Sequence, residues 1–139
     1  MMMLKRMICG ALLAGISAAA FAGAGSWSAD GYGGQTQFGR QAFSGRTLEA
    51  PAAESLSGAR VTSVAWSISA SSADVTVKLC ASGANCLTLP GVSGTMTWPE
   101  SAAPRAGDSF RFVYLVNQPG RLAKPFSVNN NALTVNYAK

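Results

Sequence analysis

Apolar and polar residues alternate along most of the chain after residue 60, as they do in β-strands that bury one face. The clearest stretch is 109–116, where Phe110, Phe112, Tyr114 and Val116 share one face. The other expected strands are 62–70, 75–80, 86–89, 95–98, 126–128 and 133–137. No long window after residue 22 has helical periodicity. Short strands at this spacing predict a sandwich or a barrel, and we expect an all-β fold built as an antiparallel β-sandwich.

Turn residues separate these stretches. The segments PRAGD (104–108) and NQPG (117–120) are typical turn sequences. Three asparagines, 129–131, lie between two apolar stretches, and asparagine tolerates left-handed backbone conformations. We therefore expect a C-terminal hairpin that turns at these asparagines.

The segment 23–59 has a weaker pattern, because Gly, Ser, Ala and Gln dominate it and apolar residues are sparse. We expect two irregular strands near 27–38 and 42–48, followed by a loop at 50–54. The alternative is a disordered arm. We expect residues 23–139 to form one domain, since a chain of this length can bury about two thirds of its unfolded surface around one core.

The first 22 residues have the organisation of a secretory signal peptide. Lys5 and Arg6 form a short basic start, and the apolar run 7–21 is too short to span a membrane. Small residues flank Phe21, as signal peptidases require, so we place cleavage after Ala22, with Ala24 as the alternative site. No later apolar run is long enough to cross a bilayer. The sequence therefore predicts export without membrane insertion.

Cleavage removes Cys9 and leaves two cysteines, Cys80 and Cys86. They lie on the polar face of an expected hairpin, on either side of a turn-like loop, where a cross-strand disulfide is geometrically possible. The rival interpretation, a redox-active pair, lacks the C-x-x-C spacing and a helix N-terminus. Two thiols in a chain without histidine are also a poor metal site. We expect a structural disulfide formed in an oxidising compartment.

Composition argues against nucleic-acid binding and against several kinds of catalysis. Loss of Lys5 and Arg6 lowers the formal charge from +5 to +3, so nucleic acid is not an expected partner. The chain has no histidine, which removes Ser-His-Asp catalysis and the usual general base. A carboxylate pair could still hydrolyse a glycan, but all the carboxylates lie in expected turns or loops, where acidic side chains ordinarily face water. These residues are Asp30, Glu49, Glu54, Asp74, Glu100 and Asp108. We expect neither an enzyme nor a cofactor.

The expected strand 109–116 is apolar on both faces, because Val113 and Leu115 lie beside Arg111 on its second face. A sandwich strand normally has one wet face. Either the N-terminal segment covers Val113 and Leu115, or they form an exposed patch beside basic residues. An exposed patch would be the place where a protein partner binds.

A second hypothesis is a module that binds glycan or peptidoglycan, which needs an exposed aromatic row with nearby amides. Trp27, Tyr32, Gln35 and Gln37 could provide such a row. The other tryptophans, 66 and 98, share faces with apolar residues and are expected in the core.

Several short motifs between residue 61 and the C-terminus occur in a distinctive order. They are Val64-Ala65-Trp66, Val77-Lys78-Leu79-Cys80 with Cys86, Leu89-Pro90-Gly91-Val92-Ser93-Gly94-Thr95, Gly120-Arg121-Leu122 with Pro125, and Val135-Asn136-Tyr137. In order and spacing they resemble the flagellar FlhE family. The secretory signal and the length of the exported chain are also similar to that family, whereas the N-terminal third resembles it only weakly.

This resemblance implies a periplasmic accessory protein that acts on a flagellar component, which could be the export apparatus, the rod or a filament subunit. Members of the family are proposed either to limit proton leakage through the export apparatus or to act as chaperones that prevent misplaced assembly. The resemblance supplies no catalytic residues. Arg121 lies within one of the matched motifs, just after a tight turn in the basic C-terminal third, where it could contact a partner. We therefore expect Arg111, Val113, Leu115 and Arg121 to bind the partner, with cell-wall contact as a further possibility.

Overall fold

The computed structural model describes residues 24–51, 53–82 and 85–139, and this part of the chain folds into two antiparallel sheets. The strands are β2 (Gly25–Gly31), β3 (Gly34–Phe38), β4 (Phe43–Ser44), β5 (Arg60–Ala70), β6 (Val75–Ala81), β7 (Cys86–Leu89), β8 (Ser93–Thr97), β9 (Phe110–Val116) and β10 (Arg121–Ala138). Two short 3-10 helices are η1 (Ala53–Leu56) and η2 (Glu100–Ala102). Within the described ranges, no helix has the length and apolar character needed to cross a membrane. The predicted signal peptide, 1–22, lies outside the described residues.

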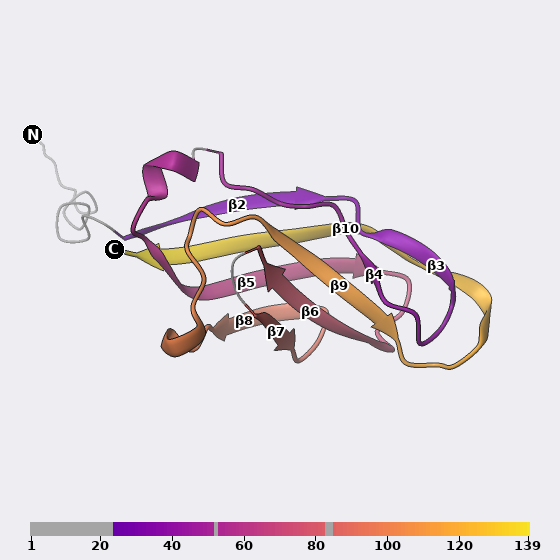
Figure 1. Ribbon diagram of the computed structural model, residues 1–139. Helices are drawn as coiled ribbons and strands as arrows, with labels where there is room; N and C mark the ends of the chain where they lie inside the picture. Colours follow the sequence, from indigo (N-terminus) through magenta and orange to yellow (C-terminus); the bar gives the residue numbers. More distant parts are fainter. Residues whose placement is uncertain (1–23, 52, 83–84) are drawn as a thin grey trace, which may run out of the picture.

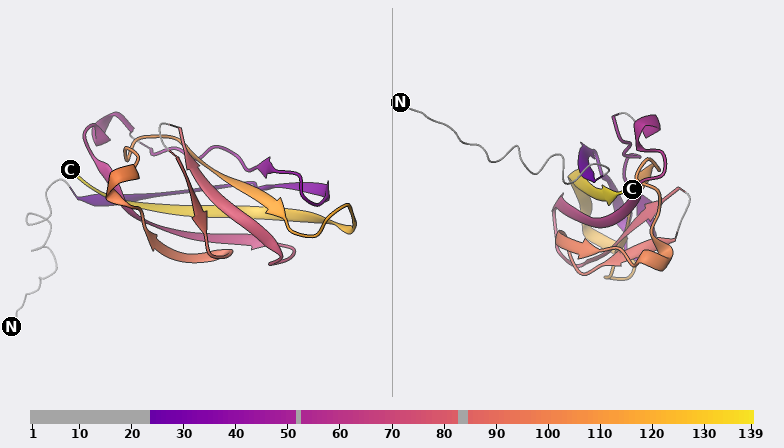
Figure 2. Two further views of the ribbon diagram at one scale, coloured as in Figure 1. Left: turned by 60° about the horizontal axis from the view of Figure 1, so that its bottom comes forward. Right: turned by 90° about the vertical axis from the view of Figure 1, so that its left-hand side faces the viewer.

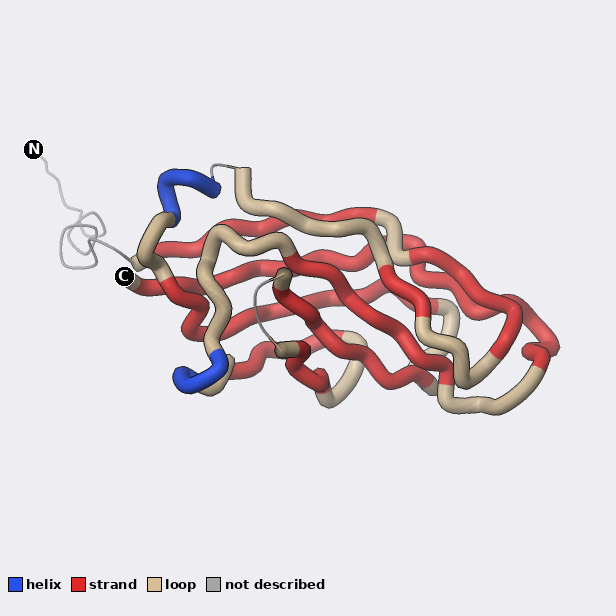
Figure 3. Tube along the Cα trace, in the orientation of Figure 1, coloured by secondary structure: helices blue, strands red, loops and turns tan. Residues whose placement is uncertain are grey.

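The two sheets lie face to face (Figures 1 and 2). One sheet has the strand order β2-β10-β5-β8, with β3 also paired to β10, and the other has the order β4-β9-β6-β7. β10 is the longest strand and runs the length of its sheet, as the yellow ribbon in Figure 1 shows. Strands make up most of the described chain (Figure 3). The predicted all-β sandwich is confirmed.

Inward-pointing residues of both sheets form one hydrophobic core. Trp27, Trp66 and Trp98 are all buried in it. The indole N–H of Trp27 donates to the carbonyl of Ala106 at 2.9 Å, and that of Trp66 donates to the carbonyl of Gly91 at 2.9 Å. Each of these two bonds satisfies a polar group that burial would otherwise leave without a partner.

The middle of the chain follows the predicted pattern closely. β6 and β7 form the expected hairpin, in which Lys78 lies opposite Thr88 and Cys80 opposite Cys86. β9 covers nearly the whole predicted range and pairs with β6 along its full length. These strands were predictable because their alternation continues without interruption.

The predicted C-terminal hairpin is wrong, because the three asparagines lie inside β10. Before them Phe126 and Val128 point into the core, and after them the residues at odd positions do so. The pairing with β5 shifts between Val128 and Asn130, which leaves Asn129 as an extra residue. This β-bulge changes the phase of the alternation, so both halves of one continuous strand bury their apolar side chains.

The N-terminal segment is extended and paired with both sheets. β2 pairs with β10 over its full length, and β4 pairs with β9. Beyond β4, Leu48 forms an isolated bridge with Phe110. The chain has three short strands here instead of the two longer ones expected near 27–38 and 42–48, and the expected loop at 50–54 runs into η1. The described part of this segment is therefore not an unpaired arm.

Candidate interaction surface

The second face of β9 lies on the outside of the sandwich. Phe110, Phe112 and Tyr114 point into the core, so the intervening Arg111, Val113 and Leu115 point outward. Arg111 is exposed, whereas Val113 and Leu115 are each half-buried. The strand geometry therefore places these three side chains on one face, as the alternation predicted.

Neighbouring strands extend this outer face on both sides of β9. Val113 lies opposite Ser44 of β4 and opposite Lys78 of β6, and Leu115 lies opposite Thr76. The N-terminal segment thus joins the edge of β9 through β4 and does not lie across its outer face. In Figure 1 this sheet faces the viewer, and no other strand crosses in front of β9.

A disulfide joins Cys80 and Cys86 at one end of the same face, with an S–S distance of 2.00 Å. Cys80 lies opposite Arg111 in the neighbouring strand. The predicted structural disulfide is confirmed. This covalent link keeps the edge strand β7 attached to β6 at the end of the sheet where Arg111 lies.

The structure does not bring Arg121 to this face. Arg121 begins β10 in the other sheet and pairs with Phe38 of β3. Its guanidinium carbon lies 5.7 Å from the centroid of the Phe38 ring, which is a cation–π contact. Arg111 lies near the start of β9, about 17 Å along the strand from Val116, where the chain turns toward Arg121. The two arginines therefore belong to different ends of the molecule.

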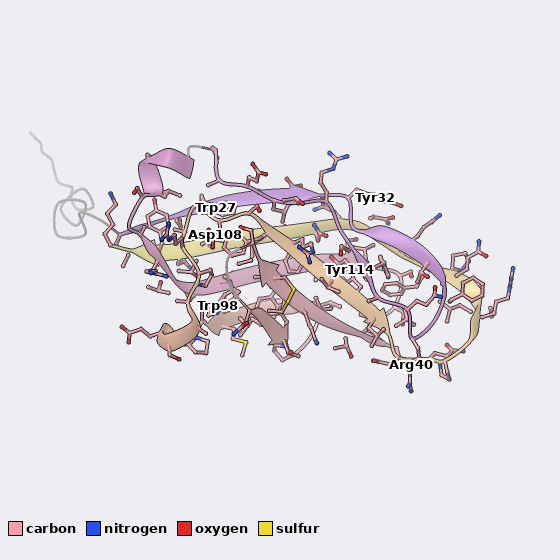
Figure 4. The ribbon with its side chains drawn as sticks, viewed as in Figure 1. Trp27, Tyr32, Arg40, Trp98, Asp108 and Tyr114 are labelled. Atoms are coloured by element: carbon pink, nitrogen blue, oxygen red, sulfur yellow. A yellow bond between two sulfur atoms is a disulfide. The ribbon has the colours of Figure 1, made fainter. Side chains whose placement is uncertain are left out.

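The aromatic row considered for a glycan is not present as predicted, because Trp27 lies in the core. Its ring packs against Phe110 with centroids 5.7 Å apart. Tyr32 is 52% exposed, and Gln35 and Gln37 are also exposed. Figure 4 shows Trp27 and Tyr32 well apart along the molecule. With Trp27 in the core, only Tyr32 of the predicted aromatic pair is exposed, and one ring does not form the stacking row that a glycan site needs.

The carboxylates with described side chains are spread over β2, η2 and several loops. Two of them have structural partners within turns. Asp74 Oδ1 accepts a hydrogen bond from Asn117 Nδ2 at 3.2 Å, and Asp108 Oδ2 accepts one from the backbone N–H of Arg105 at 3.3 Å. The described residues contain no group of three or more carboxylates or cysteines that could hold a metal ion.

One polar pair in the core was not predicted from the sequence. The hydroxyl of Tyr114 donates to Oδ1 of Asn131, and Asn131 Nδ2 donates to the carbonyl of Gly31. Burial raises the pKa of the Tyr114 hydroxyl above its usual range. Its position in the alternation could have identified Asn131, because it shares a face with the apolar residues Leu133 and Val135.

Three cavities were also not predicted. One of about 760 Å³ lies between η2 and the ends of β5, β8 and β10. A second of about 390 Å³ shares Arg60 with the first. A third of about 380 Å³ lies at the opposite end, between the β5–β6 turn and the first part of β10. Each combines residues far apart in the sequence, so alternation along single strands could not reveal them.

Known proteins share both the sequence and the fold of this chain. The family model described as flagellar protein FlhE matches residues 35–138. The flagellar protein FlhE of Yersinia enterocolitica is 31% identical over 136 residues, which cover 96% of this chain and 95% of that protein. A crystal structure of FlhE superimposes with a TM-score of 0.69 at 30% identity, covering 84% of this chain and 99% of the other. The match begins in β3, well before the region in which the sequence motifs resemble the family. The chain therefore belongs to the FlhE family of flagellar proteins.

Proposed function

We propose that this protein is a periplasmic flagellar accessory protein that binds an exported flagellar component and does not act as an enzyme. Membership of the FlhE family supports a flagellar role. The component would belong to the export apparatus, the rod or the filament. Binding would either keep such a component from assembling in the wrong place or limit proton leakage through the export apparatus.

Two features support a periplasmic location. The sequence begins with a predicted signal peptide, cleaved near Ala22, and the exported part contains the disulfide between Cys80 and Cys86. Disulfides form and persist in oxidising compartments such as the bacterial periplasm.

The observation that carries the proposal is the outer face of β9, which we call the β9 face and define as Lys78, Arg111, Val113 and Leu115. Two partly exposed apolar side chains lie beside two cations on a sheet whose edge is closed by a disulfide. An apolar centre with a charged rim is the usual organisation of a protein-binding surface. Arg121, at the other end of the molecule, is not part of this face.

The proposed mechanism is stoichiometric. A partner would bury the Val113 and Leu115 side chains, which favours binding by roughly 25 cal/mol for each Å² of apolar surface removed from water. The two cations would discriminate against basic partners and speed encounter with acidic ones. Regular strands and the disulfide keep the face rigid, so little conformational entropy is lost on binding.

The experiment compares retention of purified flagellar components by the wild-type protein and by the double variant Val113→Ser/Leu115→Ser. We expect the double variant to lose retention while its free energy of unfolding changes by less than about 1 kcal/mol, because neither side chain is in the core. Phe38→Ser is the matched control, since Phe38 is exposed in the other sheet. Arg111→Gln should weaken retention, and Arg121→Gln should not.

Several outcomes would contradict the proposal. Equal retention by the wild type and the double variant would show that the β9 face is not the binding surface. A large loss of stability would show that Val113 and Leu115 contribute to the core. Retention by purified peptidoglycan in place of flagellar components would favour the glycan-binding alternative.

A further inference from the structure

Arg60 and Arg105 lie directly opposite one another in an isolated antiparallel bridge. The N–H of Val61 donates to the carbonyl of Pro104 at 3.0 Å, and the N–H of Ala106 donates to the carbonyl of Ala59 at 2.9 Å. These two bonds flank the arginines, so the arginines form the non-hydrogen-bonded type of pair. In this type the two Cα atoms are only about 4.5 Å apart and the side chains lie closest together.

Both arginine side chains point away from the core on the same face. Their four neighbours in the two segments, at positions 59, 61, 104 and 106, are all buried. Successive residues of extended chain alternate between faces, so Arg60 and Arg105 must both point outward, and both are exposed. Backbone pairing thus holds the two arginine residues side by side, with both side chains on one face.

No carboxylate in the described part of the chain forms an ion pair with either side chain. Arg60 donates one hydrogen bond to the carbonyl of Ala103 at 3.3 Å. The nearby Asp108 accepts from the backbone N–H of Arg105. Like charges directly opposite in a β-pair are destabilising, by roughly 0.2–1 kcal/mol. The arrangement therefore weakens folding slightly and leaves most of the guanidinium donors available to an anion.

The space beside the two arginines is hollow. A recess of about 390 Å³ is lined by Arg60, Pro104, Arg105 and Asp108. Arg60 also lines the groove of about 760 Å³ under η2, whose walls include Trp98 and Pro99. In Figure 4, Trp98 and Asp108 both lie toward the end of the molecule that carries the C-terminus. The recess beside the two arginines therefore adjoins a partly apolar groove, and Arg60 lines both.

We propose that the Arg60–Arg105 pair and the adjoining groove bind an acidic polypeptide segment. A carboxylate would lie between the two guanidinium groups, which can each donate two parallel hydrogen bonds to it. A neighbouring apolar side chain would lie in the groove against Pro99 and the 3% of the Trp98 surface that is exposed. The groove is larger than a lone anion such as phosphate needs, and its apolar walls give no advantage to one, so a polypeptide fits better.

Charges along the groove would orient the segment. Glu100 and Lys139 also line it, so the carboxylate is favoured at the Arg60 end and disfavoured beside Glu100. The groove lies at the ends of β5, β8 and β10, whereas the β9 face belongs to the other sheet. The two surfaces can therefore be tested independently.

The test uses blocked dodecapeptides that carry adjacent carboxylates a few residues from a Leu or Phe, and counterparts in which Asn and Gln replace Asp and Glu. Binding is measured by titration, with the amide signals of residues 60 and 105 and the indole signal of Trp98 followed by NMR. We expect acidic peptides to bind and to shift these signals, with affinity that falls as salt rises. Arg60→Gln/Arg105→Gln should weaken binding roughly tenfold or more, and Arg46→Gln/Lys124→Gln, which also removes two positive charges but elsewhere, should not.

The proposal would be overturned by equal affinity for acidic and amide peptides, or by equal affinity of the wild type and the double variant. Binding of inorganic phosphate or of phosphatidylglycerol vesicles without binding of the acidic peptides would assign the pair to a different ligand. The double variant should unfold at the same temperature as the wild type or slightly higher, because the like-charge contact is removed. Peptide binding should persist in Val113→Ser/Leu115→Ser, so failure at one surface is distinguishable from failure at the other.

Discussion

Tyr114 of β9 and Asn131 of β10 meet inside the core, where the tyrosine hydroxyl donates to the asparagine Oδ1 at 2.7 Å. Asn131 is 0% exposed, and its Nδ2 donates to the carbonyl of Gly31 in β2 at 3.2 Å. One amide therefore connects both sheets and an edge strand. Because each member is buried, the pair specifies how the two sheets are aligned as well as how strongly they pack.

Loss of the tyrosine hydroxyl should be costly even though the ring remains. In Tyr114→Phe the buried Oδ1 of Asn131 has no donor, so the free energy of unfolding should fall by about 1–3 kcal/mol. Urea unfolding measures this change, with Tyr32→Phe as an exposed control that should have little effect. In the double variant Tyr114→Phe/Asn131→Ala, the loss should be smaller than the sum of the two single losses. Additive losses would show that the two groups do not interact.

Stability should also depend on alkaline pH through the same hydroxyl. Burial raises the pKa of Tyr114 in the folded state, whereas an unfolded tyrosine titrates near pH 10. Below about pH 10 both states keep the proton and the stability is fully present. Above it the unfolded state releases its proton first, so the free energy of unfolding falls by up to about 1.4 kcal/mol per pH unit.

Urea unfolding of the wild type and Tyr114→Phe at several pH values from neutral to strongly alkaline checks this dependence. The stability difference between the two proteins should shrink as the pH rises above about 10. Only the wild type has a tyrosine at position 114 whose ionisation favours the unfolded state. A difference that stays constant over that range would contradict the prediction.

The fold was predictable wherever one alternation pattern continued through a strand. β6, β7 and β9 satisfy this condition, and their cysteines lie where a cross-strand bond can form. β10 does not, because a bulge at Asn129 changes which positions face inward. A change of phase at asparagines is compatible with a turn or a bulge, and only pairing with β5, distant in sequence, distinguishes them.

The candidate surfaces were predictable only in part, for a related reason. Arg111, Val113 and Leu115 lie on one strand, so alternation alone places them together. Whether Arg121 lies near them depends on how the two sheets pack, and no local sequence pattern carries that information. The same holds for Arg60 and Arg105, whose pairing joins β5 to a segment that the sequence indicates only as a turn.

Removal of the disulfide should weaken the hairpin but leave the fold intact. A bond that closes a loop between residues six positions apart contributes roughly 2 kcal/mol, mainly by restricting the unfolded chain. Cys80→Ser/Cys86→Ser should therefore unfold at lower urea concentration with an unchanged circular dichroism spectrum. Reduced wild-type protein should match the variant. If reduction leaves the urea midpoint unchanged, the bond has no part in stability.

The close contact between the β3–β4 and β9–β10 connections should make Gly39 intolerant of any side chain. Its N–H donates to the carbonyl of Gly120 at 2.8 Å, and a Cβ built on Gly39 would lie 1.4 Å from the backbone oxygen of Gln118. Backbone atoms cannot rotate away as a side chain could, so the two connections would have to separate. Gly39→Ala should lower the free energy of unfolding by about 3 kcal/mol or more.

The matched control for this substitution is Gly91→Ala. No atom lies within 4 Å of the position that its Cβ would occupy, and its φ angle is outside the left-handed region. Alanine there restricts the unfolded chain, so stability should be unchanged or rise by up to about 1 kcal/mol. Equal losses at both positions would mean that backbone freedom matters and not the contact with Gln118. Equal tolerance at both positions would mean that the two connections are not held together in solution. The hydrogen bond from the Arg40 N–H to the carbonyl of Val116 spans the same contact, so it would then be absent as well.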